Sequence, residues 1–486
     1  MRGNVFLSNL LKQFSRLGLV WVTGTCLLSS GQESAKETNS DVARMSALQK
    51  PCRIEVTDKS NGWPVPLVEL RTTHEVRFVT DNAGAIAFDL PELMGRPVWF
   101  DVIGNGYEVN RDGFGARGVR LTPEPGKTIK VQVNRTIIAR RIGRITGGGL
   151  YAESQKCGTE LDWEESGILG CDSVQNAVHR GRLFWLWGDT TIPNYTLGIF
   201  DGTSATTAVQ PLTSFKPPLH LRLNYFTDSK GSPRGIAKMP GSGPTWITGY
   251  ASLPDTRGHS HLIGSYVKIR PPMEAYERGL CVWNEDSSNF QQLRVIWKKS
   301  QSTPNPPPIP EGHPALWKDE RGKEWILFGN PFPNLRFPAS FESWQDPSTW
   351  EVLKPQATLV SKNDQSPIKP HSGSIAWNPW RKRWVTVFMQ AFGKPSAFGE
   401  LWYAESLNPT GPWGPAVKIL SHENYTFYNP RLHPEFTAVD SPILIFEGTY
   451  TKQFADKPQP TPRYEYNQML YRLDLDDAAL KGAQLN

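Results

Sequence analysis

The sequence predicts an all-β protein in which a small β-sandwich is followed by a five-bladed β-propeller. Glycine (42 residues) and proline (41 residues) are frequent and lie between short apolar runs, a texture typical of many strands joined by turns. Strongly apolar runs recur at a long period after residue 137. No long stretch with the 3.6-residue period of a helix follows that point, which argues against an α/β fold.

Length and composition set the outer limits. A chain of 486 residues is too long for one ordinary hydrophobic core, so more than one folded unit is expected. Hydrophobic residues make up 38% and charged residues 21%, which is typical of a globular protein. The formal net charge of +6 comes without a block of Lys or Arg, so no nucleic-acid partner is expected.

The first 31 residues have the order of a secretory signal. Arg2, Lys12 and Arg16 precede the apolar run 17–28, and small residues follow. That run is too short to span a bilayer, so no transmembrane segment is predicted. The expected location is therefore secreted or periplasmic. Lipid anchoring through Cys26 is an alternative, although Thr25 stands where bacterial lipoprotein signals usually have Gly or Ala.

Four further cysteines, Cys52, Cys157, Cys171 and Cys281, remain after such a signal is removed. An even number in an exported chain permits disulfides, and Cys157 with Cys171 is the favoured pair because the segment between them is short. Two unpaired thiols are the equal alternative. The spacing of the cysteines matches no metal-binding motif.

Residues 32–50 are polar and unpatterned and are expected to be a linker, and residues 51–136 then carry short alternating strands. The strands are expected at 53–57, 66–70, 84–88, 98–102 and 129–133. The stretches NGWPVPLVEL and TDNAGAIAF, with an aromatic strand ending near Gly106 and Tyr107, resemble a carboxypeptidase-regulatory-like, transthyretin-type β-sandwich. The resemblance implies a structural or adhesive module without chemistry of its own.

The rest of the chain, residues 137–486, contains the long repeat. Its strongly apolar runs start about every 60 to 80 residues, a spacing that fits a four-stranded blade with loops. We expect each run to be the second strand of a blade, and five such blades fill this part of the chain. The runs are Leu183–Trp187, His261–Val267, Trp325–Phe328, Trp384–Phe388 and Ile443–Phe446.

Polar residues keep the phase of this repeat. A polar side chain shortly before a run is expected to open the innermost strand of the blade, and these are Asp172, His313, His371 and His433, with only Thr245 in the second blade. Because neighbouring strands are antiparallel, the end of each run returns to the same face. The residues there are Asp189, Asn330, Gln390 and Glu447, and Glu400 opens the third strand of the fourth blade.

One mouth is therefore expected to collect four carboxylates, Asp172, Asp189, Glu400 and Glu447, with three histidines. Simpler interpretations exist: Asp189 lies in a turn sequence, and His313 and His433, each before a proline, are able to bond backbone groups. A metal held at the axis by the three histidines is a minor alternative, and no cofactor is predicted.

Aromatic and amide groups favour a carbohydrate ligand. The chain has 18 tryptophans, and flat rings such as Trp187 stack on the apolar faces of sugars, although packing between blades explains most of them. A C-terminal run rich in hydrogen-bonding groups adds Tyr428, Asn429, Arg463 and Tyr466. Arg463 either clamps an anionic group or forms a structural ion pair.

Two stretches, CDSVQ…RLFWLWGDT and GELWYAESLNPTGPW, resemble those of five-bladed bacterial glycosidases of the arabinanase and β-xylosidase type. The resemblance implies that an Asp of the first blade, matched by Asp172, is the base. It also implies a second Asp that tunes a pKa, for which the second blade offers no match, and a Glu that is the acid. Here the acid would be Glu447, with Glu400 in reserve.

The sequence therefore predicts hydrolysis of a glycoside in an exported or extracellular polysaccharide, with a carboxylic acid protonating the leaving oxygen and a carboxylate activating water. The alternative is a non-catalytic carbohydrate-binding or cell-surface propeller that uses the same mouth. The substrate-binding side chains are expected to be Asp189, His313, His371, His433, Asn429, Arg463 and Trp187.

Overall fold

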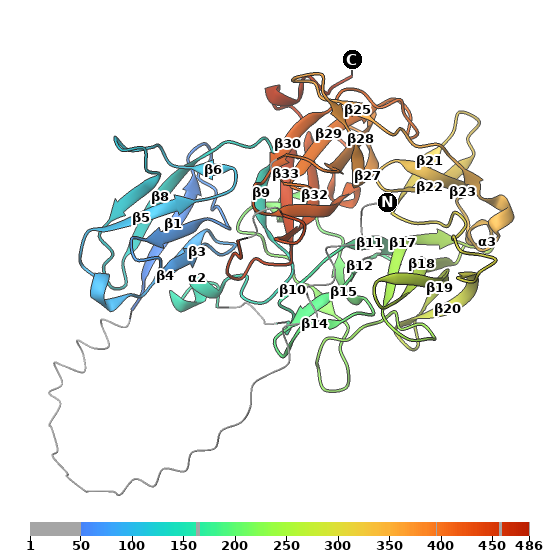
Figure 1. Ribbon diagram of the computed structural model, residues 1–486, viewed down its shortest axis with the longest axis horizontal. Helices are drawn as coiled ribbons and strands as arrows, with labels where there is room; N and C mark the ends of the chain where they lie inside the picture. The colour runs from blue at the N-terminus through green and yellow to red at the C-terminus, as the bar shows by residue number, and fades with distance from the viewer. Residues whose placement is uncertain (1–49, 162–165, 395, 456–458, 486) are drawn as a thin grey trace, which may run out of the picture. The chain divides into compact units, whose positions relative to one another are not determined.

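The structure is a computed structural model that describes residues 50–485 except 162–165, 395 and 456–458. The prediction that the chain is nearly all β is confirmed, since the described helices are short and few beside the strands (Figure 1). The expected secretory signal, Cys26 and nearly all of the expected linker lie outside the described residues. No helix in the described part of the chain is long and apolar enough to cross a membrane.

Residues 51–136 form two four-stranded sheets that share one core. Ile54 and Val56 of one sheet pack in the same buried cluster as Leu70 and Phe100 of the other. The strand expected from residue 66 begins only at Glu69. The strand orders are β4 (Ala85–Phe88), β1 (Cys52–Asp58), β8 (Thr128–Arg135) and β6 (Tyr107–Glu108), and β3 (Arg77–Val79), β2 (Glu69–Thr72), β5 (Val98–Ile103) and β7 (Gly118–Leu121).

Five further four-stranded antiparallel sheets follow, here called sheets 1 to 5 (Figure 1). Each of the five apolar runs lies in the second strand of its sheet. In strand order, sheet 1 contains β11 (Gln175–His179), β12 (Arg182–Trp187), β15 (Thr203–Ala208) and β16 (Asn224–Tyr225), and sheet 2 contains β17 (Thr245–Pro254), β18 (Ser260–Arg270), β19 (Glu274–Asn284) and β20 (Asn289–Lys298). Sheet 3 contains β21 (His313–Lys318), β22 (Glu324–Gly329), β23 (Pro333–Pro338) and β24 (Glu351–Val352), and sheet 4 contains β27 (Pro370–Asn378), β28 (Arg383–Gln390), β29 (Glu400–Ser406) and β30 (Val417–Ser421). Sheet 5 contains β31 (Thr426–Leu432), β32 (Ile443–Thr451), β33 (Asn467–Asp474) and β9 (Arg140–Arg144).

The second strands are apolar throughout because both of their faces are buried. In β12, Phe184 and Leu186 pack in the core shared with sheet 2, whereas Trp185 and Trp187 pack in the core shared with sheet 5. Successive side chains of a strand point to opposite faces, so a strand between two neighbours cannot alternate apolar with polar residues. The continuous apolar run is therefore the sequence mark of a sheet packed on both sides.

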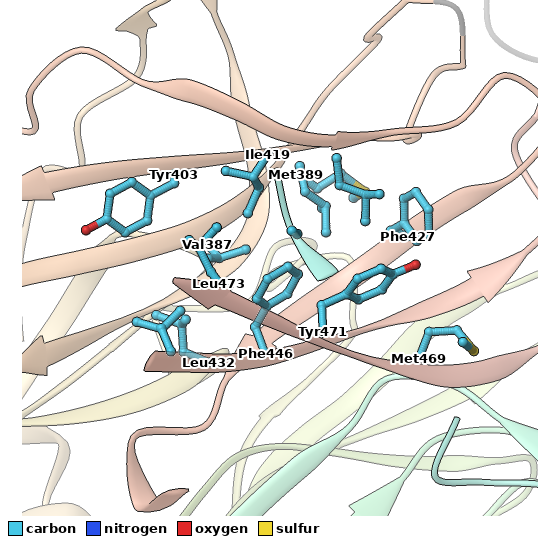
Figure 2. Close-up of a cluster of buried hydrophobic side chains, with 14 of the residues drawn as sticks. Val387, Met389, Tyr403, Ile419, Phe427, Leu432, Phe446, Met469, Tyr471 and Leu473 are labelled. Atoms are coloured by element: carbon cyan, nitrogen blue, oxygen red, sulfur yellow. The ribbon is translucent and has the colours of Figure 1, made fainter. Parts of the chain in front are cut away.

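Cores of this kind join every sheet to the next one. Between sheets 4 and 5, Val387 and Tyr403 pack with Phe446 and Tyr471 (Figure 2). Separate clusters lie between sheets 2 and 3 and between sheets 3 and 4. The cluster that contains Trp185 joins sheet 5 back to sheet 1. The series of packed sheets thus returns to its beginning.

Strand β9 completes sheet 5 with a segment from the other end of the repeat. It precedes sheet 1 in the chain, yet it pairs antiparallel with β33, with Arg144 opposite Met469. Smaller elements fill the connections between the sheets. These are β10 (Gly170–Cys171), β13 (Thr190–Ile192), β14 (Tyr195–Ile199), β25 (Leu359–Val360), β26 (Pro367–Ile368), α2 (Ala152–Lys156) and α3 (Phe341–Gln345).

The favoured disulfide is absent from the structure. Cys157 and Cys171 are unpaired, as are the other two cysteines among the described residues. Cys171 lies wholly inside the core between sheets 5 and 1, and burial raises the pKa of its thiol well above the ordinary value. The alternative of unpaired thiols is the one observed.

Candidate functional site

Asp172 and Asp189 lie side by side at a break between two strand ladders. On one side of the break Cys171 of β10 pairs with Thr190 of β13, and on the other side β11 pairs with β12. The amide of Asp172 donates to the carbonyl of Asp189 over 3.3 Å. Gly188 permits this arrangement, because a Cβ there would lie 2.3 Å from Oδ1 of Asp172.

Two tyrosines, Tyr428 in β31 of sheet 5 and Tyr466 directly before β33, hold the Asp172 carboxylate. The hydroxyl of Tyr466 donates to Oδ2 of Asp172 over 2.7 Å, and the hydroxyl of Tyr428 donates to the same oxygen. Burial raises the pKa of Asp172, and the tyrosine bonds oppose that rise because they stabilise the carboxylate. Asp172, which lies between β10 and β11, is thus positioned by two side chains that come much later in the chain.

The pKa of Asp189 is raised as well. Burial raises its pKa to about 6, and the negative charge of Asp172 adds to the rise. The indole Nε1 of Trp246, in β17 of sheet 2, donates to Oδ1 of Asp189 over 2.9 Å and opposes the rise. Burial thus raises the pKa of both carboxyl groups, which lie next to each other.

Asn429 contacts Ser173, the residue that follows Asp172 in the chain. Its side-chain amide donates to Oγ of Ser173 over 2.7 Å, and the amide of Ser173 donates to the hydroxyl of Thr449 over 3.2 Å. Both Asn429 (φ 53°) and Ser173 (φ 52°) have left-handed backbone, a conformation that costs free energy in residues other than glycine and that clusters at functional sites.

His313 opens β21, as expected, but its side chain is buried rather than exposed at a mouth. One of its ring nitrogens, Nδ1, lies 3.0 Å from the guanidinium of Arg431. Burial lowers the pKa of His313 well below its ordinary value, and the Arg431 charge lowers it further. Arg431 also donates to the side-chain oxygen of Asn176 over 2.7 Å, which links sheets 5, 3 and 1.

His433 and Glu447 are not where the repeat phase placed them. Strand β31 begins at Thr426 and ends at Leu432, so His433 follows an innermost strand instead of opening one. Glu447 lies in the middle of β32, which continues to Thr451. Both side chains are wholly buried, with His433 Nε2 3.7 Å from Glu447 Oε1, and neither Glu447 oxygen has a hydrogen-bond partner among the described residues. Glu447 is thus an interior group, and the prediction that it ends a strand at an open mouth is wrong.

Glu435 is the partner of His433 in this interior. The ring Nδ1 of His433 lies 2.8 Å from Oε1 of Glu435, which also accepts a 2.7 Å bond from Asn176. Burial alone would lower the pKa of His433, but the charge of Glu435 and that of Glu447 raise it above the ordinary value. Burial opposes ionisation of Glu435 as well, yet His433 and Arg431 lower its pKa. The sequence patterns did not single out Asn176, Arg431 or Glu435.

Glu400 and Trp187 are both occupied by other contacts. Glu400 opens β29, as expected, but it is buried and its Oε1 accepts a 2.5 Å bond from Nζ of Lys418. Trp187 is wholly buried and stacks on Trp185 with 5.9 Å between ring centroids. Its predicted contact with a sugar is wrong because its faces are inside the core.

Arg463 and His371 have different surroundings. The guanidinium of Arg463 lies 3.2 Å from a carboxylate oxygen of Glu153 in α2, which favours the structural ion pair over an anion clamp. His371 is the second residue of β27, and its exposed ring lies 4.7 Å from that of Phe398. Among the residues that the structure describes, no group of three or more His, Cys, Asp and Glu side chains is arranged to hold a metal ion.

Comparison with known proteins gives fold-level likenesses alone. No protein-family model matches the chain, and no curated protein sequence matches it. An exo-1,5-α-L-arabinanase from a bovine ruminal metagenomic library is 12% identical over 64% of this chain and 94% of its own, with a TM-score of 0.37. An arabinanase from Bacillus subtilis is 11% identical over 63% and 96%, with a TM-score of 0.33. An exo-β-1,3-galactanase from Phanerochaete chrysosporium is 9% identical over 69% and 65%, with a TM-score of 0.38.

Proposed function

We propose that sheets 1 to 5 are the blades of a five-bladed β-propeller that carries a glycoside-hydrolysing site, and that residues 51–136 are a transthyretin-type β-sandwich attached to it. The packing of each sheet on the next, with a return from sheet 5 to sheet 1, supports the propeller. The shared core of the two small sheets supports the sandwich. Secretion, with or without a lipid anchor at Cys26, belongs to the same proposal.

The observation that carries the proposed activity is the Asp172–Asp189 pair. Hydrolysis of a glycoside needs an acid and a base, and the pKa of about 6 at Asp189 suits the acid, because a carboxyl group with that pKa stays protonated in mildly acid solution. Asp172 keeps the role of base that the sequence predicts. Asp189 takes the role of acid in place of Glu447 and Glu400, because those two glutamates are buried away from any mouth.

The proposed reaction is a displacement at the anomeric carbon. Protonated Asp189 donates its proton to the leaving glycosidic oxygen as the bond from that oxygen to the anomeric carbon breaks. A water molecule attacks the same carbon, and the Asp172 carboxylate takes its proton. After the reaction Asp189 is ionised and Asp172 is protonated. Proton exchange with solvent then returns each carboxyl group to its starting protonation state. Tyr428 and Tyr466 hold Asp172 in its ionised form before the attack.

The activity is tested by incubating the purified protein with arabinan, galactan and xylan and measuring released reducing ends. Asp172→Asn and Asp189→Asn are each expected to lower turnover by at least about 1,000-fold, since each removes a proton-transfer group. Glu400→Gln is the matched carboxylate control and is expected to retain turnover. Activity that survives both aspartate changes contradicts the proposed site.

A second function is supported by a specific observation. Glu400, which is paired with Lys418, and Glu447, which is buried beside His433, were both predicted to be the acid. The surface around Asp172 and Asp189 is therefore also compatible with carbohydrate binding without catalysis. In that case the unchanged protein binds a polysaccharide and releases no reducing ends. Affinity electrophoresis in gels containing each polysaccharide separates this outcome from hydrolysis.

A further inference from the structure

A row of aromatic rings runs outward from the carboxylate pair. It begins at Tyr428, the tyrosine that donates to Asp172. The ring of Phe454 lies 5.8 Å from that of Tyr428, and the ring of Phe398 lies 5.4 Å from that of Phe454. Phe392 follows at 6.4 Å from Phe398. These four residues are called the aromatic row below.

The outer members of the row are exposed. Phe392 is 76% exposed and Phe454 is 57% exposed, although burial of a phenylalanine side chain is strongly favourable. Phe398 and Tyr428 are partly buried and pack against the core between sheets 4 and 5. The row is therefore anchored at its base, and its outer rings face solvent.

Backbone conformation gives an independent observation. Phe392 has φ 57° and Phe454 has φ 64°, values in the left-handed region that bulky residues rarely adopt. Such a conformation is costly and persists where the surrounding structure requires it, commonly at ligand-binding positions. Glycine would fit both positions without that cost. Two exposed phenylalanines in strained positions, both in contact with Phe398 and linked to the carboxylate pair through Tyr428, point to a ligand.

The place of the row in the chain links it to the proposed site. Phe392 follows the end of β28, Phe398 precedes β29, and Phe454 follows the end of β32. The ring of Phe454 contacts the ring of Tyr428, whose hydroxyl donates to Asp172, so the row is linked to the carboxylate pair through Tyr428.

We propose that the aromatic row is a stacking surface for successive sugar rings of a glycan chain whose reacting unit lies at Asp172 and Asp189. This inference rests on the proposed function and names the substrate as an oligomer or polymer rather than a single sugar. A sugar ring has one apolar face and a rim of hydroxyls, which matches rings that end at carboxylates. A wholly apolar ligand would bring no hydrogen-bond donor to the carboxylates of Asp172 and Asp189, whereas the hydroxyls of a sugar would.

Binding is measured by isothermal titration calorimetry in the Asp172→Asn background, which prevents turnover. The probes are arabinotriose, galactotriose and xylotriose, with the matching monosaccharides. Phe392→Ala and Phe454→Ala are each expected to weaken binding of a recognised trisaccharide by about 10-fold and to change monosaccharide binding by less than about 2-fold. Phe114→Ala removes a fully exposed phenylalanine of residues 51–136 and is expected to change neither.

Substitution by glycine separates a ligand role from a structural one. Phe392→Gly and Phe454→Gly relieve the left-handed strain, so the midpoint of thermal unfolding is expected to stay unchanged or to rise while trisaccharide binding falls. A lower midpoint, unchanged binding in the alanine variants, or no binding of any of the three trisaccharides overturns the stacking surface. If the unchanged protein binds a trisaccharide through Phe392 and Phe454 but hydrolyses no glycan, only the proposed activity is overturned. If hydrolysis is the same with and without the two phenylalanine rings, only the stacking surface is overturned.

Discussion

The backbone amide of Asp172 donates to the backbone carbonyl of Asp189 over 3.3 Å, and their side chains are close enough for the charge of one to raise the pKa of the other. Residues far apart in the chain fix this relationship. Tyr428 in β31 and Tyr466 directly before β33 donate to Asp172, and Trp246 of sheet 2 donates to Asp189. The geometry of the carboxylate pair therefore depends on how sheet 1 packs against sheets 2 and 5.

Changing Asp172 to Asn is expected to shift the titration of Asp189. The charge of Asp172 contributes to the raised pKa of Asp189, so its removal lowers that pKa below about 6. Carboxyl ¹³C NMR of the two proteins follows the titration directly. An unchanged or higher pKa at Asp189 in the variant contradicts the coupling. Asp319→Asn, at a partly exposed carboxylate in the turn between β21 and β22, is the control.

Trp246→Phe is expected to move the alkaline limb of the activity profile to higher pH. Turnover requires protonated Asp189, so it falls as pH rises through the pKa of about 6. The indole N–H stabilises the ionised form, and its loss raises the pKa further. Rates measured from pH 4 to 8 show the shift. Trp325→Phe loses a similar bond, to Asp319, and should leave the profile in place.

Glu435→Gln is expected to lower the free energy of unfolding by about 3–5 kcal/mol, because it leaves the charges of His433 and Arg431 buried without their partner. Urea unfolding measures the loss. Glu351→Gln, which breaks the more exposed pair with Arg336, is expected to cost less than about 1 kcal/mol.

The difference between Glu435→Gln and the unchanged protein depends on pH. The raised pKa of His433 gives stability that is complete below its ordinary value of 6.5 and is lost as pH rises through the folded value. The lowered pKa of Glu435 gives stability that is complete above its ordinary value of 4.5 and is lost as pH falls through the folded value. The cost is therefore greatest between about pH 4.5 and 6.5. A cost that is flat with pH contradicts an ion pair.

Trp187→Ala is expected to destabilise the protein by about 3–5 kcal/mol, the cost of a large cavity in a packed core. Trp187→Phe keeps most of the volume and is expected to cost much less. Chemical unfolding measures both changes. Glycan affinity in the Phe variant should match that of the unchanged protein, and a selective loss of affinity would return Trp187 to the binding site.

The second strand of each sheet was predictable, because a strand that is buried on both faces has an unbroken run of apolar residues. Leu183–Trp187 and Trp384–Phe388 each lie inside the observed β12 and β28. The failure at His433 has the same physical origin. In sheet 5 the innermost strand ends one residue before His433, so a fixed offset from the second strand counted to the wrong end.

The site was predictable only where a residue stands next to a strand end. Asp172 and Asp189 flank the paired strands β11 and β12, and both were named from that position. Trp246, Arg431 and Asn176 act through contacts between different sheets, and no periodicity within one sheet reports them. The burial of Glu447 was hidden for a related reason, because β32 continues past it to Thr451.

Strand β9 ties the completion of sheet 5 to two segments that lie far apart in the chain. It precedes sheet 1, but its partner β33 follows sheets 1 to 4 and is the last strand among the described residues. Tyr428 and Tyr466, which hold Asp172, belong to that later part of the chain. A chain shortened before Tyr428 would therefore keep Asp172 and lose both tyrosines that hold its carboxylate.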